Sequence, residues 1–98
     1  MYKVQLSRQA QKDVIKVERA GLKSKTAQII QTVRNNPYDE SQGFEKLKGD
    51  LKGFYSRQIN YQHRFVYEVL LNAENLTDAK GMPYDGIVKV LRMWTHYE

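Results

Sequence analysis

The sequence predicts an α+β fold of the order β–α–α–β–β–β–β: an N-terminal strand, a two-helix hairpin and an antiparallel meander of four strands. Apolar residues recur at helical spacing between Ala10 and Val33, and they alternate at strand spacing from Arg64 to Leu71. Helices and strands that are grouped along a chain, without regular alternation, are typical of α+β domains. A length of 98 residues favours one domain, over residues 1–98.

The first elements are expected to be a strand and two helices. Tyr2 to Leu6 alternates apolar and polar residues, which indicates a strand with one buried side. Ser7 suits the N-cap of a helix that Gly21 ends. A second helix is expected from about Ser24 to the Asn35-Asn36-Pro37 sequence, because the residue before a proline is driven out of the helical region. So short a link between two helices favours an antiparallel hairpin.

Each helix is expected to bury one face. Apolar residues recur every three or four positions, whereas lysine and arginine fall on the other faces. The buried stripes are expected to comprise Ala10, Val14 and Val17 in the first helix, and Ala27, Ile30 and Val33, with Ile29 beside them, in the second.

The second half of the chain is expected to form the meander. Aromatic and β-branched residues are frequent in it, and clusters of glycine, asparagine and aspartate separate the strands. A long loop from Asn72 to Gly86 precedes the last strand. The helical hairpin would cover one face of the sheet, and the other face would stay partly open to solvent. The four strands are expected at Phe44 to Lys48, Phe54 to Asn60, Arg64 to Leu71 and Ile87 to Tyr97.

Composition narrows the classes of function. Lys and Arg outnumber Asp and Glu by 16 to 11, which gives a net charge of +5 and favours a polyanionic partner such as RNA, DNA or an acidic protein segment. The same charge could also serve solubility alone. The absence of cysteine excludes disulfides, thiolate catalysis and Cys-based zinc sites. No apolar run approaches the ~20 residues that a membrane span needs, and no signal peptide is evident, so a cytoplasmic protein without membrane contact is expected.

Basic and aromatic residues are concentrated between residues 44 and 64. Cations there could contact phosphates while the rings stack on unpaired bases, a combination that suits RNA. The pattern fits equally well a solvated strand face whose aromatic rings pack in the core, and the sequence leaves both interpretations open. The residues concerned are Glu45, Lys46, Lys48, Lys52, Arg57, His63 and Arg64, with Phe54, Tyr55 and Tyr61 between them.

One carboxylate, several cations and one imidazole are the minimum set for metal-independent RNA cleavage. A base takes the proton from a ribose 2′-OH, and the oxygen attacks the adjacent phosphate. A cation stabilises the charge on the phosphate oxygens, and an acid protonates the departing 5′-oxygen. The two histidines, His63 and His96, have no metal-ligand spacing, so no metal or other cofactor is expected. A lone histidine such as His96 is more often a surface or hydrogen-bonding residue.

Four stretches of the second half form a specific pattern. They are Glu45-Lys46-Leu47-Lys48, Leu51-Lys52-Gly53-Phe54-Tyr55-Ser56-Arg57, Gln62-His63-Arg64-Phe65-Val66-Tyr67 and the terminal His96-Tyr97. This pattern resembles the Txe/YoeB family of toxins, which belongs to the RelE/ParE superfamily. The likeness is densest over Glu45 to Val69, and the preceding strand and helices agree with a RelE-like fold in order and length.

The resemblance implies a toxin of a type II toxin–antitoxin system, an endoribonuclease that cuts mRNA in the ribosomal A site and stops translation. On the matching positions it implies that Glu45 is the general base and His96 the general acid. Arg64 would stabilise the phosphate, and Tyr97 would position the reacting groups. The resemblance also implies that Lys48 and Arg57 contact phosphates. Lys46 and Lys52, from the basic cluster described above, complete the expected RNA- and phosphate-binding residues.

The resemblance also implies partners. They are the 70S ribosome with its mRNA, a cognate antitoxin of the YefM/Axe type, and operator DNA bound only by the toxin–antitoxin complex. An acidic, partly disordered antitoxin suits a surface with a charge of +5. Family members can also be dimers.

Two departures from the family pattern and two alternative functions are left open. Gln58 stands where the family often has a second arginine, a change expected to weaken one phosphate contact. The loop from Asn72 to Gly86 is longer than expected and could contact the ribosome or the antitoxin, or be a tolerated insertion. A non-catalytic gyrase inhibitor of the ParE type and a plain nucleic-acid-binding module are the alternatives, and Glu45 and His96 argue against the first.

Overall fold

The computed structural model describes residues 1–95, and its elements follow the expected order. The α+β fold with a two-helix hairpin ahead of four consecutive strands is therefore confirmed. The elements are β1 (Lys3–Leu6), α1 (Arg8–Arg19), α2 (Lys23–Asn35), β2 (Glu45–Lys46), the short 3₁₀ helix η1 (Gly49–Leu51), β3 (Phe54–Gln58), β4 (Arg64–Leu70) and β5 (Ile87–Arg92).

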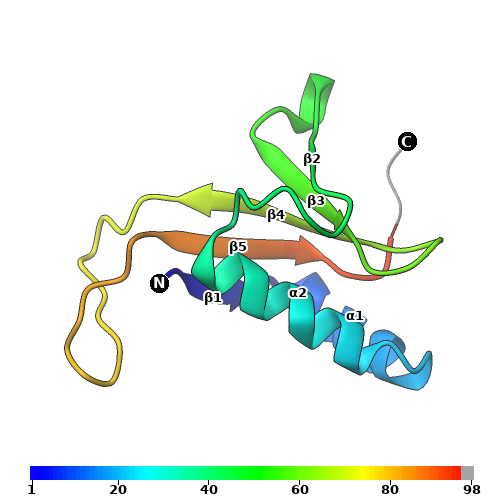
Figure 1. Ribbon diagram of the computed structural model, residues 1–98, viewed down its shortest axis with the longest axis horizontal. Helices are drawn as coiled ribbons and strands as arrows, with labels where there is room; N and C mark the ends of the chain where they lie inside the picture. The colour runs from blue at the N-terminus through cyan, green and yellow to red at the C-terminus, as the bar shows by residue number, and fades with distance from the viewer. Residues whose placement is uncertain (96–98) are drawn as a thin grey trace.

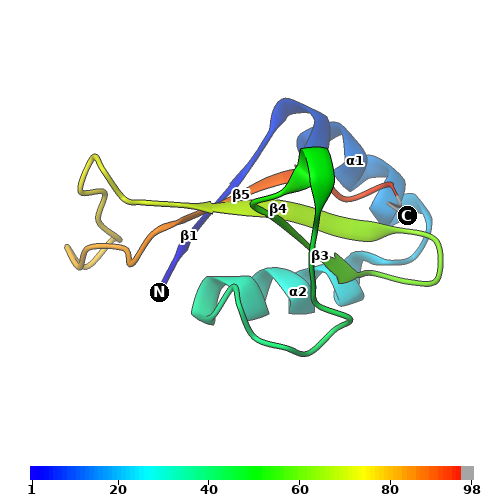
Figure 2. The ribbon, with the colours of Figure 1, turned by 90° about the horizontal axis from the view of Figure 1, so that it is seen from above.

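The strands form one five-stranded sheet in the order β1-β5-β4-β3-β2. Strands β2 to β5 pair antiparallel with their neighbours, as a meander requires, whereas β1 pairs parallel with β5. Figure 1 shows both helices along the β1–β5 side of the sheet and the β2–β3 hairpin projecting on the other side. The long β4–β5 loop extends away from the end of the sheet at which β5 ends (Figures 1 and 2).

Three strands are shorter by two or more residues than the sequence predicts, and β1 and β4 are each shorter by one residue. Strand β2 has two residues, because the chain enters η1 directly afterwards. Strand β3 ends at Gln58, since the N–H groups of Ile59 and Asn60 donate to the carbonyl of His63 in a tight turn. Strand β5 was expected to reach Tyr97 but ends at Arg92, where a side chain of α1 takes over the hydrogen bonds of the next two N–H groups.

The stripe that α2 buries also differs from the expected one. Ile29 and Val33 are fully buried and Thr26 nearly so, while Ala27 is exposed and Ile30 only partly buried. The Thr26 hydroxyl donates to the Leu22 carbonyl at 2.9 Å, so its polar atom is satisfied within the helix and its methyl group can face the core. The prediction from hydrophobicity alone therefore included Ala27 and Ile30 in the buried stripe and missed Thr26.

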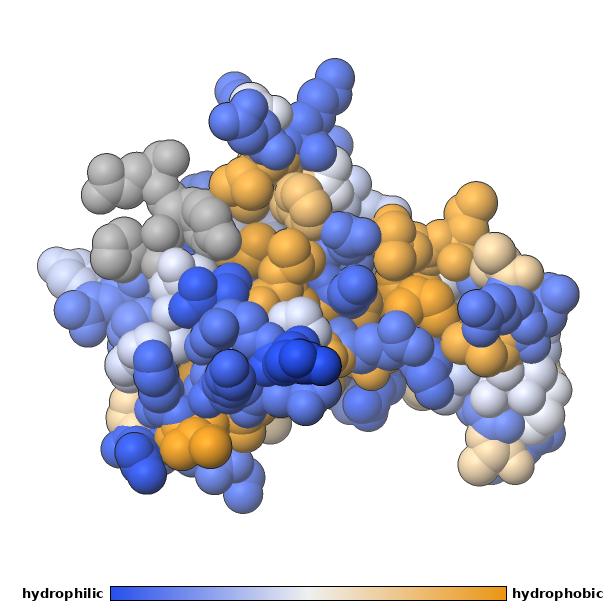
Figure 3. Space-filling model, turned by 180° about the vertical axis from the view of Figure 1, so that it is seen from behind, coloured by the Kyte–Doolittle hydropathy of each residue, from blue (hydrophilic) through white to orange (hydrophobic). Residues whose placement is uncertain are grey.

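The core lies between the helices and one face of the sheet. Phe65, Tyr67, Val88 and Val90 are fully buried on that face. Because side chains alternate along a strand, Arg64 and Val66 of β4 and Ser56 of β3 face the opposite way. Figure 3 shows the molecule from behind, with the polar tip of the β2–β3 hairpin above a surface on which apolar side chains gather.

Replacing Ser7 by alanine is expected to lower the free energy of unfolding by about 1 kcal/mol. Its Oγ accepts a hydrogen bond from the N–H of Ala10 at 3.0 Å as the N-cap of α1, and it donates to the Leu91 carbonyl at 2.8 Å. Urea denaturation measures the loss. Ser24→Ala, at an exposed position in the first turn of α2, is the control, and an equal effect of both changes would contradict the capping role.

Candidate functional site

Three strands bring Glu45, Ser56 and Arg64 together on the face opposite the core. Glu45 of β2 is the cross-strand partner of Ser56 in β3. Arg64, at the start of β4, donates from Nε to the Ser56 Oγ at 2.8 Å and from Nη2 to the Gly43 carbonyl at 2.6 Å. The same Nη2 lies 3.9 Å from Glu45 Oε2. The carboxylate and the guanidinium that are far apart in the sequence thus meet around one point.

The two charged groups differ in how firmly they are held. The Arg64 side chain is 16% exposed and fixed by two hydrogen bonds, whereas the Glu45 side chain is 60% exposed. Within residues 1–95, Nη1 of Arg64 makes no hydrogen bond. The arrangement therefore places an accessible carboxylate beside a fixed guanidinium whose Nη1 is available to donate a hydrogen bond. Such a pair can accept a proton and bind an anion at the same time.

The lysines of the β2–β3 hairpin line a neighbouring hollow. Lys46, Lys48 and Lys52 surround an open space of about 410 Å³, whose floor includes Phe54 and Tyr55. All three lysines are exposed. The expected basic surface is present here, on the same β2–β3 hairpin that carries Glu45.

Arg57 does not lie on that surface, contrary to the expected phosphate contact. Its side chain is fully buried, because alternation along β3 turns it toward the core while Ser56 faces outward. Nη2 donates to the carbonyls of Pro37 at 3.1 Å and Asp39 at 2.6 Å, and Nη1 donates to the carbonyl of Ser41 at 3.0 Å. The guanidinium thus holds the loop after α2 against the sheet.

Tyr67 completes the arrangement around Arg57. Its hydroxyl accepts from Arg57 Nε at 3.1 Å and donates to the Pro37 carbonyl. Burial raises the pKa of Tyr67 to about 12, so the hydroxyl remains a donor at physiological pH. The neighbouring Tyr55 packs against Tyr67 and Phe44. For Arg57 and Tyr55, the structural interpretation of the basic and aromatic cluster is the correct one.

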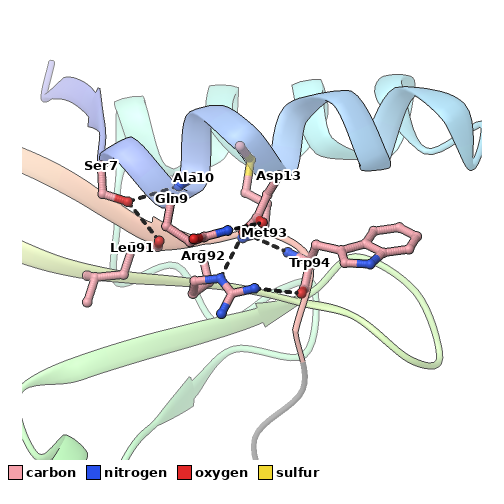
Figure 4. A network of polar contacts seen from close by, with 8 residues as sticks. All are labelled: Ser7, Gln9, Ala10, Asp13, Leu91, Arg92, Met93 and Trp94. Carbon is pink, nitrogen blue, oxygen red and sulfur yellow. Dashed lines mark hydrogen bonds and ion pairs between the residues drawn. The ribbon is translucent and has the colours of Figure 1, made fainter.

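Asp13 of α1 is a buried charged residue that the sequence did not single out. Its Oδ2 accepts hydrogen bonds from Arg92 Nε at 2.9 Å, from the Met93 N–H at 2.9 Å and from the Trp94 N–H at 3.3 Å (Figure 4). Its Oδ1 accepts from Gln9 Nε2 at 3.1 Å. Asp13 is fully buried. A signal existed, because Asp13 falls three residues after Ala10, on the apolar stripe of the helix, where a charge is unexpected.

The chain that leaves β5 is held at a second point. The ring of Trp94 stacks on His63, with ring centroids 3.7 Å apart and an interplanar angle of 16°. The carbonyl of Thr95 accepts from the N–H of Arg64 at 2.6 Å. Thr95 is the last described residue, and it lies beside the arginine of the candidate site. His96 and Tyr97, the expected acid and positioning residue, lie outside the described residues.

Asp13 is expected to make stability depend on pH in acid. Burial raises the pKa of Asp13, but the hydrogen bonds from Arg92, the Met93 N–H and Gln9 outweigh burial and hold it below 3.8. A carboxyl whose pKa is lower in the folded state stabilises fully above the unfolded value and progressively less as the pH falls through the folded one. Urea denaturation from about pH 5 down to about pH 2 should show a flatter profile for Asp13→Asn than for the wild type. Parallel profiles would contradict the expectation.

Within residues 1–95, no group of three or more His, Asp or Glu side chains is arranged to hold a metal ion. Two of the carboxylates described above form an ion pair with an arginine. Glu45 pairs with Arg64, and Asp13 of α1 pairs with Arg92. Neither helix is long and apolar enough to cross a membrane.

Known proteins are similar to this chain in sequence and in fold. Toxin YoeB of Escherichia coli is 42% identical over 45 residues, which cover 46% of this chain and 54% of that protein. The chain therefore spans about half the length of the curated relatives it matches. The YoeB dimer from Staphylococcus aureus aligns with a TM-score of 0.72 and 26% identity, over 98% of both chains. The heterotetrameric YoeB–YefM toxin–antitoxin complex from the same organism aligns with a TM-score of 0.70 and 26% identity, over 99% of both chains.

A family model matches most of the chain. It describes a YoeB-like toxin of a bacterial type II toxin–antitoxin system, and it matches residues 7–97. The matched range includes Glu45, Arg64, Asp13 and the C-terminal segment. The protein belongs to the family of YoeB-like toxins of bacterial type II toxin–antitoxin systems.

Proposed function

We propose that the protein, acting as a single domain over residues 1–98, is an endoribonuclease that cleaves mRNA in the ribosomal A site and so inhibits translation. The observation that carries the proposal is the meeting of Glu45 and Arg64 on a solvent-facing surface, with a lysine-lined hollow on the same β2–β3 hairpin. Each group has a role in the attack of a ribose 2′-oxygen on the adjacent phosphate.

The first half of the reaction falls to the two described groups. The exposed Glu45 carboxylate accepts the proton of the 2′-OH as general base. Arg64, held by Ser56 and the Gly43 carbonyl, directs its remaining donor to a non-bridging phosphate oxygen. The 2′-oxygen forms a bond to phosphorus while the bond from phosphorus to the 5′-oxygen breaks.

His96 gives its proton to the departing 5′-oxygen in this proposal, and Tyr97 positions the reacting groups. The hydrogen bond between the Thr95 carbonyl and the Arg64 N–H supports these roles, because the chain continues directly from Thr95 to His96. Proton transfer and charge stabilisation by side chains account for the whole step, so the proposal needs no metal ion or cofactor.

Lys46, Lys48 and Lys52 are proposed to contact phosphates of mRNA or ribosomal RNA from the hollow that they line. Arg57 has no part in these contacts, because its donors are engaged with carbonyl groups inside the protein. The surface that binds RNA is therefore the β2–β3 hairpin and the adjoining open face of the sheet.

The proposed protein partner is an acidic, partly disordered antitoxin of the YefM type. The Staphylococcus aureus YoeB–YefM complex supports this partner, and the YoeB dimer from that organism supports self-association of the toxin. Operator DNA would be bound only by the complex with the antitoxin. A net charge of +5 suits both an acidic peptide and RNA.

The test is a translating bacterial extract in which mRNA 5′ ends are mapped after addition of the protein. We expect cuts inside the reading frame that disappear when the start codon is removed. The new ends should carry a 5′-OH, because attack by the 2′-oxygen leaves the phosphate on the other fragment. Uncut message, cutting without translation, or 5′-phosphate ends would contradict the proposal. DNA breaks in expressing cells without mRNA cutting would point instead to a gyrase inhibitor.

A further inference from the structure

We propose that Asp13 is a positioning residue whose carboxylate fixes the path of the chain after β5 and thereby holds the segment that carries His96 against Arg64. Asp13 is a fully buried charge that the proposed chemistry does not itself use. The inference rests on the proposed ribonuclease function and adds to it a residue from α1, far from the catalytic surface in the sequence.

The first step of the argument is the geometry at the end of β5. In a regular strand, successive N–H groups point to opposite sides. Here the N–H groups of Met93 and Trp94 both donate to Oδ2 of Asp13, at 2.9 and 3.3 Å. A single oxygen atom therefore collects two successive donors, and the chain must turn out of the sheet at this point.

Arg92 fixes the same turn from its other side. Its Nε donates to Asp13 Oδ2 at 2.9 Å, while its Nη2 donates to the carbonyl of Trp94 at 3.1 Å (Figure 4). Both backbone polar groups of Trp94 are thus held by one ion pair. Asp13 in turn is held to α1 by its own backbone and by Gln9. The turn is attached to a helix instead of to a neighbouring strand.

The segment beyond the turn contacts the candidate site. The Trp94 ring stacks on His63, the residue before Arg64, and the Thr95 carbonyl accepts from the Arg64 N–H. A continuous series of contacts therefore runs from Asp13 through Trp94 and Thr95 to the arginine that we propose to bind the phosphate. This series fixes the position of Thr95, the residue directly before His96 in the sequence.

Placement of the acid explains why such an attachment would matter. Chain ends are usually poorly ordered unless they are tied down. A general acid acts only when it is held close to the productive geometry, and a misplacement of about 1 Å can cost about 10²-fold in rate. Asp13 supplies the fixed point from which a short segment can present its imidazole.

The test uses Asp13→Asn, which keeps the size of the side chain and removes its charge. Trp94 is the single tryptophan of the chain, so its fluorescence reports on the turn directly. We expect its emission to shift to longer wavelength and its quenching by acrylamide to increase, with unchanged far-UV circular dichroism. In ribosome-dependent cleavage we expect kcat to fall about 10-fold or more, with little change in KM. Glu18→Gln, the same chemical change at an exposed position of α1, should behave as wild type.

A double-mutant cycle separates positioning from a merely structural role. If Asp13 acts through His96, then Asp13→Asn should cost little further activity in a His96→Ala background. A full additional loss in that background, or unchanged kcat in the single variant, would overturn the proposal. Should Asp13→Asn fail to fold, Arg92→Gln removes the ion pair with Asp13 and the hydrogen bond to the Trp94 carbonyl, at a partly exposed side chain. If the wild type cleaves no mRNA, the proposed function fails, and unaltered Trp94 quenching would overturn the attachment separately.

Discussion

Glu45→Gln should reduce the rate of ribosome-dependent mRNA cleavage by ~10²–10⁴-fold while leaving the fold intact. Glutamine keeps the shape of the side chain but cannot accept the 2′-OH proton. The Glu45 side chain is 60% exposed, and its only ion pair within residues 1–95 is a 3.9 Å approach to Arg64, which has two other hydrogen bonds to hold it. Stability is therefore expected to change by no more than the ~0.5 kcal/mol of an ordinary surface substitution.

The measurement is single-turnover cleavage of a defined mRNA on stalled ribosomes, together with urea denaturation of each variant. Glu68→Gln is the matched control, because Glu68 lies on the same face of the sheet, in β4, opposite Phe54. It removes one negative charge from that face without touching Arg64. If Glu45→Gln cleaved as fast as Glu68→Gln, the general base would have to be another group.

The order of elements could be predicted because its signals are local. Ser7 accepts a hydrogen bond from a residue three positions on, and Gly21 ends the helical region in the left-handed conformation with φ of 76°. Alternation along β4 was equally clear. The parallel pairing of β1 with β5 was not predicted, since it joins strands more than eighty residues apart and no local pattern encodes such a partner.

The candidate site was predicted only in part, for a related reason. A specific sequence pattern marked Glu45 and Arg64, and the structure brings the two side chains to within 3.9 Å of each other. Asp13 was missed because its partners, from Arg92 to Trp94, are 79 to 81 residues away. Helical periodicity could show that a charge lies on an apolar stripe, but not which distant groups would neutralise it.

Arg57 belongs to a sequence pattern that was recognised, but its side chain was expected at the RNA-binding surface and is buried instead. It stands next to Ser56, whose hydroxyl supports Arg64, and both belong to the same stretch of the sequence pattern, from Leu51 to Arg57. Neighbours in a strand point to opposite faces, so only one of the two could face solvent. The prediction that Arg57 contacts a phosphate did not take this alternation into account. The donors of Arg57 serve loop carbonyls that no periodicity predicts.

Arg57→Ala is expected to lower the free energy of unfolding by about 3 kcal/mol or more, because it leaves buried acceptors without donors and opens a cavity. The carbonyls of Pro37, Asp39 and Ser41 would each lose a hydrogen bond from the guanidinium. The guanidinium also lies 4.9 Å from the centre of the Phe44 ring, a cation–π contact that alanine cannot replace. Part of this loss is offset, because the folded Arg57→Ala protein no longer carries the desolvation cost of a buried guanidinium.

Urea and thermal denaturation of Arg57→Ala, Arg57→Lys and Lys48→Ala would decide between a structural arginine and a phosphate contact. Lysine offers fewer, less directed donors, so Arg57→Lys should be destabilised to an intermediate degree. Lys48 is exposed and lines the hollow, so Lys48→Ala should keep its stability within about 0.5 kcal/mol and instead weaken salt-dependent binding to ribosomes. The opposite result, a stable Arg57→Ala protein that binds ribosomes poorly, would return Arg57 to the RNA-binding surface. That outcome would require the loop from Pro37 to Ser41 to release the guanidinium when RNA binds.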